Sequence, residues 1–496
     1  MSGFNKMPSV AAANKVPAAV SKIVNAMPDT HNLAGGQAFK NTPQFTLASM
    51  LVTSFMEDQY YRSKAQTVID LQNAISAVDP LFAAKAIIYA RTKYGMRSVS
   101  HVGAAYIAKK VKGESWTKRF FDKVVYRVDD AAEILAAYIY LHKKPIPNCL
   151  KKGLGLSMSK FDAYQLAKYK GTKDAVKLVD LFNLVHPKPN EKNAEAFKQL
   201  IEGNLGAANT WEAKMSAAGQ AAKDEEEAEQ LKTDAWDELL KTNKLGYFAL
   251  LRNLKNIVGT GKSELIDLAC QRLTNREAIK KSLVLPFRFS TAAAQFTGHT
   301  SADRQVLTAI NDAVTLSLDN VPKFGGKTLV AMDASGSMLG KPAEIGSLSA
   351  AVLAKSNNAD VILFDGSARY LGMNLADSLL TIRNTICMAC RGGSTNFNSI
   401  FTTANERYDR IIILSDMQAW VDYNTPASSY AAYCKRFEAT PNVYCFDLAG
   451  YGTTQFTTSA PNVYQLAGFS DKTMELLQSL EVSPTALIDE INKIEI

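Results

Sequence analysis

The residues best suited to chemistry are acidic and hydroxyl side chains in the last third of the chain. Asp333, Ser335 and Ser337 lie in one short motif, and a glycine between the two serines permits a tight turn. Thr395 follows in a glycine-rich loop, and Asp416 closes a later apolar run. Carboxylate and hydroxyl oxygens are hard donors that suit Mg²⁺ or Mn²⁺, with water completing the coordination. The spacing therefore predicts a divalent-cation site, one position of which could accept a carboxylate or phosphate from a partner.

An enzymatic interpretation competes with the cation site. An aspartate after a first strand is the nucleophile of aspartyl-phosphate hydrolases, but those enzymes need a second acid where this chain has Ser335. The chain also lacks a G-x-S-x-G elbow, a phosphate-binding loop and a G-x-G-x-x-G turn. Cys387 and Cys390 have no second pair or nearby His, so a zinc site is disfavoured; a redox pair and two packed helix cysteines both stay open. We expect no enzymatic activity, and a metal-dependent hydrolase is the weakest hypothesis.

Short apolar runs alternate with helical stretches after Pro322. The strand-like runs are Thr328–Asp333, Asp360–Asp365, Arg410–Asp416, Asn442–Leu448 and, more weakly, Asn462–Ala467. The helical stretches between them are Glu344–Lys355, Ala376–Met388 and Ser428–Glu438. This alternation predicts a doubly wound parallel sheet of Rossmann type, with strands buried on both faces. Because ligand sites of such sheets lie at the carboxyl ends of the strands, the candidate donors should meet at that edge.

The first 321 residues differ in pattern and in charge. They contain 43 Lys+Arg and 31 Asp+Glu, a net charge of +12, whereas residues 322–496 contain 13 and 17, a net charge of −4. From Thr46 to Phe296 apolar residues recur at helical spacing, with short breaks at Pro or Gly. This pattern predicts stacked helical hairpins or an α-solenoid. The positive charge favours a polyanion as partner, although on charge alone a lysine-rich soluble surface is the simpler interpretation.

The chain has the features of an intracellular protein. No apolar stretch approaches the roughly 20 residues that a membrane-spanning helix needs, and Met1–Thr30 lacks the apolar block of a signal peptide. The six cysteines are sparse and irregularly spaced, as in proteins that keep their thiols reduced. We therefore expect a cytoplasmic protein that makes no contact with membranes.

Cationic side chains recur along the predicted helices of the basic part. One set is Lys168, Lys170, Lys173 and His186, and a second set, spaced i, i+4, is Arg119, Lys123 and Arg127. Rows of Lys and Arg neutralise phosphates without reading sequence, and an imidazole can stack on an unpaired base. Each row alone is more often a solvated helix face, and a His before a proline more often ends a helix than binds a ligand. The two sets are candidates for RNA contacts.

The pattern D-x-S-x-S…T…D resembles the metal-ion-dependent adhesion site of von Willebrand factor A domains. Its members are Asp333, Ser335, Ser337, Thr395 and Asp416, which occur in the same order at the ends of predicted strands. The resemblance implies that residues 322–496 form such a domain and hold Mg²⁺ or Mn²⁺. It also supports an alternative hypothesis, in which this domain is a metal-dependent protein–protein adhesion module and the helical part is a spacer.

Several segments of the basic part resemble the TROVE module of Ro ribonucleoproteins. They are Ala90-Arg91, Gly95-Met96-Arg97 with His101, Arg127-Val128-Asp129-Asp130, Lys168-Tyr169-Lys170, Asp180 through Pro189, Trp211-Glu212 and Leu251-Arg252-Asn253-Leu254. The resemblance covers about Phe45 to Phe296, and the A-like domain follows in the expected order. It implies an N-terminal arm (residues 1–44), a TROVE domain of HEAT-like helical hairpins forming a ring or solenoid (45–321), and an A domain (322–496).

The resemblance to Ro proteins also implies a function. They bind small noncoding Y RNAs on an outer basic surface and accept the single-stranded 3′ ends of misfolded RNAs through a central hole. On the matching positions, Lys168, Lys170 and His186 would contact RNA. We expect a monomer, because an intramolecular ring needs no second copy, and an exoribonuclease as a protein partner. The chain departs from the family pattern at Lys173, near which family members often carry Arg, and before Tyr60, where a glycine-rich loop is absent.

Overall fold

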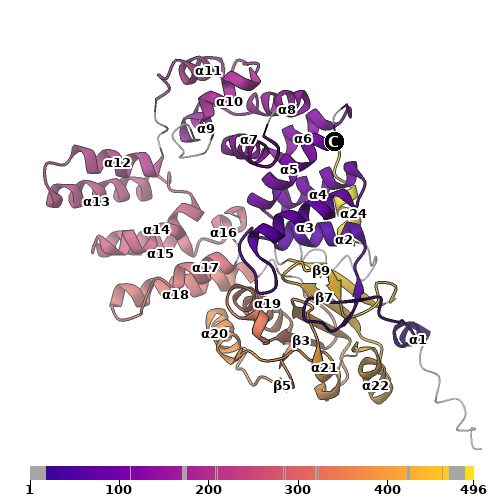
Figure 1. Ribbon diagram of the computed structural model, residues 1–496. Helices are drawn as coiled ribbons and strands as arrows, with labels where there is room; N and C mark the ends of the chain where they lie inside the picture. The colour runs from indigo at the N-terminus through magenta and orange to yellow at the C-terminus, as the bar shows by residue number, and fades with distance from the viewer. Residues whose placement is uncertain are drawn as a thin grey trace, which may run out of the picture.

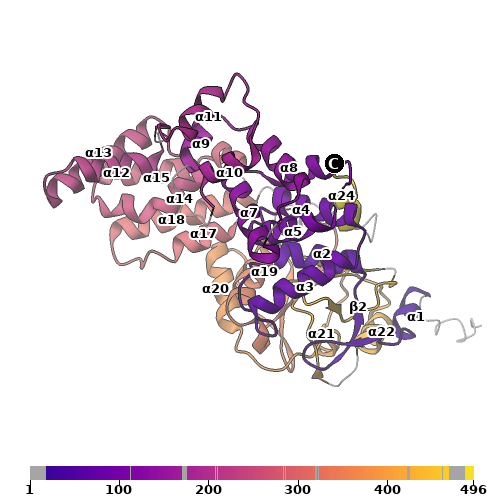
Figure 2. The ribbon, with the colours of Figure 1, turned by 45° about the horizontal axis from the view of Figure 1, so that its top comes forward.

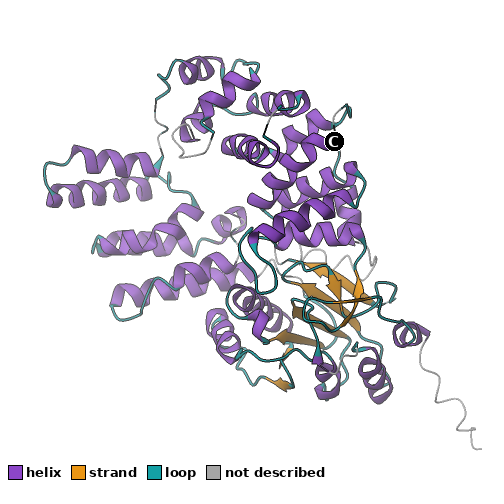
Figure 3. Cartoon of the chain, in the orientation of Figure 1, coloured by secondary structure: helices purple, strands orange, loops and turns teal. Residues whose placement is uncertain are grey.

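The structure is a computed structural model that describes residues 18–496 except 112, 144, 170–175, 207, 209, 283, 285, 319, 320, 322, 422–424, 461 and 469–485. The chain is mainly helical as far as Ser317 and then forms a sheet domain covered by helices (Figure 3). This arrangement confirms the predicted fold class, a helical part followed by an α/β part. Within the described ranges, no helix is both long enough and apolar enough to cross a membrane.

The helical part is built from neighbouring pairs of helices. Their bounds are α2 Pro43–Thr53, α3 Lys64–Ser76, α4 Pro80–Lys93, α5 Ser98–Lys110, α6 Thr117–Val124, α7 Val128–His142, α8 Asn148–Met158, α9 Ala163–Tyr169, α10 Leu178–Val185, α11 Ala194–Ile201, α12 Trp211–Ala221, α13 Glu225–Lys241, α14 Tyr247–Gly259, α15 Ser263–Leu273, α16 Arg276–Ser282, α17 Pro286–Ala293 and α18 Ser301–Ser317. Most of these helices bury apolar side chains against a neighbour, as α14 does with Leu250, Leu254 and Ile257, whereas α12 has no buried residue. Side chains of Thr42 and Asp79 cap α2 and α4, and each cap precedes a proline that favours the first turn.

The sheet domain has six strands in the order β5-β4-β3-β6-β7-β9. Their bounds are β3 Thr328–Asp333, β4 Asp360–Phe364, β5 Ala368–Tyr370, β6 Arg410–Ser415, β7 Asn442–Asp447 and β9 Val463–Ala467. All neighbours are parallel except β4 and β5, which are antiparallel. The five predicted strand runs are confirmed, whereas the short antiparallel edge strand β5 was not predicted because it has no apolar run.

Helices cover both faces of this sheet (Figure 1). They are α19 Lys341–Asn357, α20 Leu379–Ala389, α21 Asn398–Thr403 and α22 Ala427–Phe437, and the one-turn helix η3 Gly336–Met338 follows β3. Val330 and Met332 pack into a core that is continuous with the helical part, whereas Leu329 and Ala331 pack into a separate core on the opposite face. The strands are therefore buried on both faces, as their continuous apolar sequences predict.

Both ends of the helical arc rest on the sheet domain (Figures 1 and 2). Helix α2 packs against β9 and against the C-terminal helix α24 (Ala486–Asn492), while α17 and α18 pack against α19 and α20. The helical part is therefore an arc that begins and ends on the sheet domain (Figure 1). Whether the arc forms the ring that the resemblance to Ro proteins implies stays a prediction.

Each end of the described chain packs against the part to which it does not belong in sequence: the N-terminal segment lies on the sheet domain, and the C-terminal helix lies on the helical part. The short helix α1 (Ala18–Val24) packs on α22, and the hairpin β1 (Thr30–His31) and β2 (Gln37–Lys40) pairs with β8 (Thr453–Thr454) of the sheet domain. In the other direction, α24 packs on α4. The domain boundaries at residues 44 and 321 stay predictions. The contacts of the N-terminal segment with the sheet domain, and of α24 with α4, were not predicted.

Candidate cation site and candidate nucleic-acid surface

The predicted cation donors meet at the carboxyl edge of the sheet. Asp333 ends β3, and Asp416 directly follows β6, the parallel neighbour of β3. Ser335 and Ser337 lie in the turn into η3, and their hydroxyl oxygens are 3.4 Å apart. The buried Thr395 belongs to a loop that is tied to this turn by backbone hydrogen bonds from Gly336 to Gly393 and from Gly392 to Ala334. The structure thus brings together the five residues that the sequence pattern had selected.

The two carboxylates of this site are buried, and neither forms an ion pair with a Lys, Arg or His side chain among the described residues. Asp333 is 0% and Asp416 is 1% exposed. Burial raises the pKa of Asp333, and burial together with the Asp333 charge raises the pKa of Asp416. Asp416 Oδ2 is also buried and has no hydrogen-bond partner among the described residues. A bound cation would relieve both the like-charge repulsion and the unsatisfied oxygen.

The chemistry of the donors restricts the kind of cation. No group of three or more His, Cys, Asp or Glu side chains is placed to hold a metal within the described part of the chain. A cation at this edge would therefore depend on hydroxyl oxygens and water beside the two carboxylates. That donor set fits Mg²⁺ or Mn²⁺ and does not fit a softer metal such as zinc.

Three neighbours of the site were not selected from the sequence. Ser415 donates a hydrogen bond of 2.5 Å to Asp333 Oδ2 and orients that carboxylate. Asp447 ends the next strand, and burial raises its pKa to about 6. Tyr61, from the helical part, has its hydroxyl beside Ser337, and burial together with the Asp416 charge raises the pKa of Tyr61. Sequence position could have indicated Ser415 and Asp447, because both end strands, but nothing in the sequence connects residue 61 with residue 337.

The structure describes two of the four candidate RNA-binding residues of the first set, Lys168 and His186. Lys168 is exposed near the end of α9, with its Nζ 5.8 Å from the centre of the Tyr169 ring. The Arg127 guanidinium lies 4.7 Å from the centre of the same ring. His186 is exposed and ends α10 with a positive φ of 44°. Lys170 and Lys173 lie outside the described residues.

The second set does not form the single helical row that its spacing predicted. Arg119 and Lys123 are exposed on α6, which ends at Val124. Arg127 lies beyond that end, in extended conformation at the start of α7, so its place on the same helix face was wrong. Its guanidinium donates to Asp129 at 3.0 and 2.8 Å. Lys123 Nζ donates to the backbone oxygen of Glu495 near the C-terminus.

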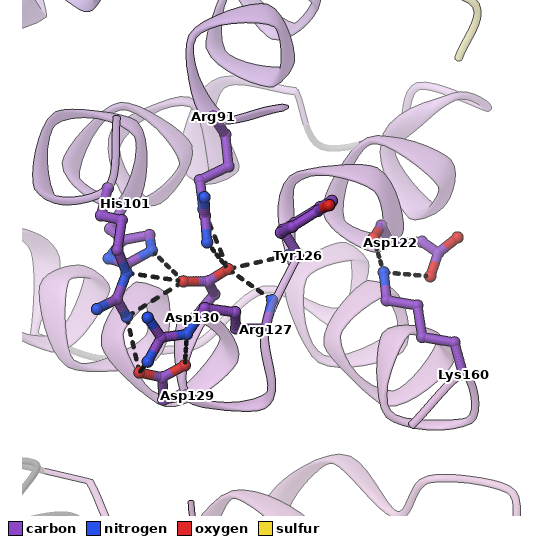
Figure 4. A network of polar contacts seen from close by, with 9 residues as sticks. Arg91, His101, Asp122, Tyr126, Arg127, Asp129, Asp130 and Lys160 are labelled. Atoms are coloured by element: carbon purple, nitrogen blue, oxygen red, sulfur yellow. Dashed lines mark hydrogen bonds and ion pairs between the residues drawn. The ribbon is translucent and has the colours of Figure 1, made fainter. Parts of the chain in front are cut away.

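Asp130 is the centre of a buried polar network that joins three helices (Figure 4). It accepts hydrogen bonds from Arg91 Nε and Nη2 on α4, at 3.1 and 2.7 Å, and lies 2.9 Å from His101 Nε2 on α5. The backbone N–H groups of Tyr126 and Arg127 also donate to it, at 2.9 and 2.8 Å. The network fixes α7 against α4 and α5. Arg91, His101 and Asp130, which belong to the segments that resemble the TROVE module, therefore hold these helices together.

The acidic and basic side chains of this network pair with one another within the helical part. Burial alone would raise the pKa of Asp130, but the His101 hydrogen bond and the Arg91 charge hold it well below its usual range. Arg97 pairs with both Asp129 and Asp130, at 2.8 and 3.3 Å. Much of the positive charge of this segment is therefore already neutralised. Lys168, beside the Tyr169 ring that Arg127 contacts, and His186, at the end of α10, remain exposed.

Comparison with known proteins gives matches of two kinds. The family model described as the TROVE domain matches residues 44–235 and 205–315. The telomerase protein component 1 of Rattus norvegicus is 24% identical over 323 residues, which are 48% of this chain and 12% of that protein. An RNA-binding protein RO60 of Deinococcus radiodurans is 24% identical over 339 residues, which are 59% of this chain and 63% of that protein. The chain thus spans less than two thirds of each of these relatives.

A solved structure has the same fold. The crystal structure of the Deinococcus radiodurans RO (RSR) protein superimposes with a TM-score of 0.59 and 18% sequence identity, covering 90% of this chain and 100% of that one. The likeness includes the helical part and the sheet domain together, because neither part alone would reach this coverage.

Proposed function

The chain belongs to the TROVE domain family, whose model matches more than half of it, and from this membership we propose that its helical part binds RNA. The observation that carries the proposal is the exposed Lys168 beside the Tyr169 ring and Arg127, with His186 exposed on the next helix. The exposed ammonium of Lys168 beside an aromatic ring suits a phosphate backbone with an adjacent unpaired base. The net charge of +12 over residues 1–321 gives such a surface the right sign.

The RNA is proposed to be small, noncoding and structured, of the Y RNA type. Two features support this class over long single strands. Contacts by lysine and arginine read the backbone and not the sequence, so shape selects the ligand. A ring closed by the sheet domain leaves the outside for folded RNA, and we place the single-stranded 3′ ends of misfolded RNAs at the inside of the ring. The protein would act in RNA quality control or as a scaffold, as a monomer in the cytoplasm, and would recruit an exoribonuclease.

The sheet domain is proposed to hold Mg²⁺ or Mn²⁺ in the manner of a von Willebrand factor A domain. Asp333, Ser335, Ser337, Thr395 and Asp416 would be its ligands, and the buried, unsatisfied Asp416 Oδ2 supports this assignment. When bound, the cation would supply a positive charge for joining parts of the assembly. The protein would bind and would not catalyse a reaction. The alternative, metal-dependent adhesion to a partner protein, rests on the same donor set.

Replacing Lys168 and His186 together with alanine should weaken binding of a small structured RNA by about tenfold or more. The loss follows from one phosphate contact and one base contact, while the exposed positions leave the core unchanged. The slope of log affinity against log salt should also fall by about one unit, because one fewer counterion is released. Fluorescence anisotropy with labelled RNA at several salt concentrations measures both quantities.

A matched control removes one lysine and one histidine from a surface outside the proposed RNA site. His31 and Lys40 are exposed on the β1–β2 hairpin beside the sheet domain, and their replacement by alanine should leave the affinity unchanged. An equal loss in both double variants would show that only net charge matters and would remove the proposed site. A wild-type protein without affinity for RNA at low ionic strength would remove the proposed function itself.

A further inference from the structure

The segment between α2 and α3 lies along the rim of the candidate cation site. We call residues 54–62 the strap. Gln59 Nε2 donates to the backbone oxygen of Ala449 at 3.0 Å, and Arg62 donates twice to the backbone oxygen of Gly450 at 3.2 Å. At the other side of the site, Glu57 pairs with Lys341 at 2.9 Å. The strap is thus attached to the loop after β7 and to the start of α19.

The junction beneath the strap is closely packed. A side-chain carbon added at Gly450, whose φ is 71°, would lie 2.5 Å from Thr53 Oγ1 and 3.2 Å from Met50 Cα of α2. Arg62 is 6% exposed, lies 5.0 Å over the Tyr451 ring, and forms an ion pair with Asp70 of α3 at 3.0 Å. A buried arginine that serves both parts of the protein indicates a built contact and not a chance approach of two surfaces.

Tyr61 is the residue through which the strap reaches the donors. Its ring packs edge-on against Tyr451 at 5.7 Å, and its backbone N–H lies 3.5 Å from the Tyr451 hydroxyl. Its own hydroxyl lies beside Ser337 and near the Asp416 carboxylate. The neighbouring Tyr60 is 68% exposed, but its hydroxyl lies near Gly336 of the donor turn, so Tyr140 on α7, which is 79% exposed, is the suitable comparison.

A cavity of about 230 Å³ separates the strap from the sheet domain. Phe55, Glu57 and Tyr60 of the strap line one side, and Ser337, Leu339 and Lys341 line the other. Since one water occupies about 30 Å³ of liquid volume, the cavity has room for the waters that an Mg²⁺ ion with few carboxylate ligands retains. The ion pair with Glu57 offsets the positive charge of Lys341, which would otherwise oppose a cation nearby.

From these contacts we infer that the cation site is shared between the two parts of the chain, with Tyr61 as the residue of the helical part that hydrogen-bonds to the hydrated cation or to its ligand Ser337. The inference rests on the proposed cation site. A cation bound there fastens the strap to the sheet domain and so closes the ring at the α2 side. An acidic segment of another protein would first have to displace the strap, and the site therefore serves an internal junction.

Hydrogen exchange of the strap with and without Mg²⁺ tests this inference on the full-length protein. In the wild type, Mg²⁺ should slow exchange of residues 54–62 by at least about fivefold relative to chelator, which is the effect of one net hydrogen bond. Tyr61→Phe should still bind Mn²⁺ in a calorimetric titration but should show less than about a twofold change in exchange. Tyr140→Phe, which removes an exposed hydroxyl on α7, outside the strap, should behave as the wild type.

The possible outcomes distinguish failure of the shared junction from failure of the cation site on which it rests. If Mn²⁺ binds to the wild type while exchange of the strap stays the same, the cation site stands and the shared junction is overturned. The same holds if Tyr61→Phe responds to Mg²⁺ as fully as Tyr140→Phe does. If neither Mg²⁺ nor Mn²⁺ binds, the cation site and the inference are both overturned.

Discussion

Replacing Asp130 with alanine should lower the free energy of unfolding by about 3–5 kcal/mol, because it leaves the buried Arg91 without its partner. Asp130 is 0% and Arg91 is 4% exposed, so water cannot replace the lost carboxylate. The backbone N–H groups of Tyr126 and Arg127 would lose their acceptor as well. Urea unfolding followed by the helical circular dichroism signal measures the difference.

Asp129→Ala is the matched control for this loss. The partners of Asp129 are Arg97 and Arg127, whose side chains are 35% and 38% exposed. Screening by water weakens such pairs, so the control should lose no more than about 1 kcal/mol. Equal losses in the two variants would contradict the central place of Asp130 in the network.

The pH dependence of the network has a defined sign. The pKa of Asp130 is lower in the folded protein than its ordinary value of 3.8, so the ionised carboxylate is the form that folding favours. Its contribution to stability is complete above that ordinary value and is lost as the pH falls toward the lowered pKa. The difference in stability between the wild type and Asp130→Asn should therefore shrink as the pH falls below that ordinary value, which urea unfolding at a series of acidic pH values measures.

The sheet and its donor residues could be predicted because their signals are local. Thr328–Asp333 is a continuous apolar run that ends in an acid, and the strand has these bounds in the structure. Parallel strands place their carboxyl ends at one edge, so Asp333 and Asp416 had to approach each other once β3 and β6 were neighbours. The order of strands was the additional information that only the structure supplied.

The helical part was harder to predict in detail because periodicity does not define where a helix ends. The spacing of Arg119, Lys123 and Arg127 is helical, yet α6 stops at Val124 and leaves Arg127 in the next segment. The Asp130 network joins residues 29 and 39 positions apart, and the strap meets residues almost 400 positions away. Contacts between such distant residues leave no periodic pattern in a single sequence.

Addition of Mg²⁺ should raise the stability of the sheet domain by about 2.7 kcal/mol when the free cation is at one hundred times its dissociation constant, provided that it binds only the folded state. Asp416→Asn should abolish most of this response, because it removes one of two carboxylate ligands. In chelator the same variant should be more stable than the wild type, since it removes a buried charge that faces Asp333. Thermal unfolding of both proteins, with Mg²⁺ and with chelator, measures the four values.

With Mg²⁺ the wild type should be the more stable protein, and with chelator Asp416→Asn should be. This reversal distinguishes a cation ligand from a residue that only supports the fold. Asp447→Asn is the comparison, because Asp447 is also buried at the end of a strand and also has a raised pKa. Like Asp416, it has one carboxylate oxygen that accepts from backbone N–H groups and one without a partner among the described residues, but it does not belong to the five predicted donors. It should keep the response to Mg²⁺ whatever its effect on stability. A structural role for Asp416 alone would make Asp416→Asn less stable in chelator as well, and that result would exclude the two-carboxylate cation site.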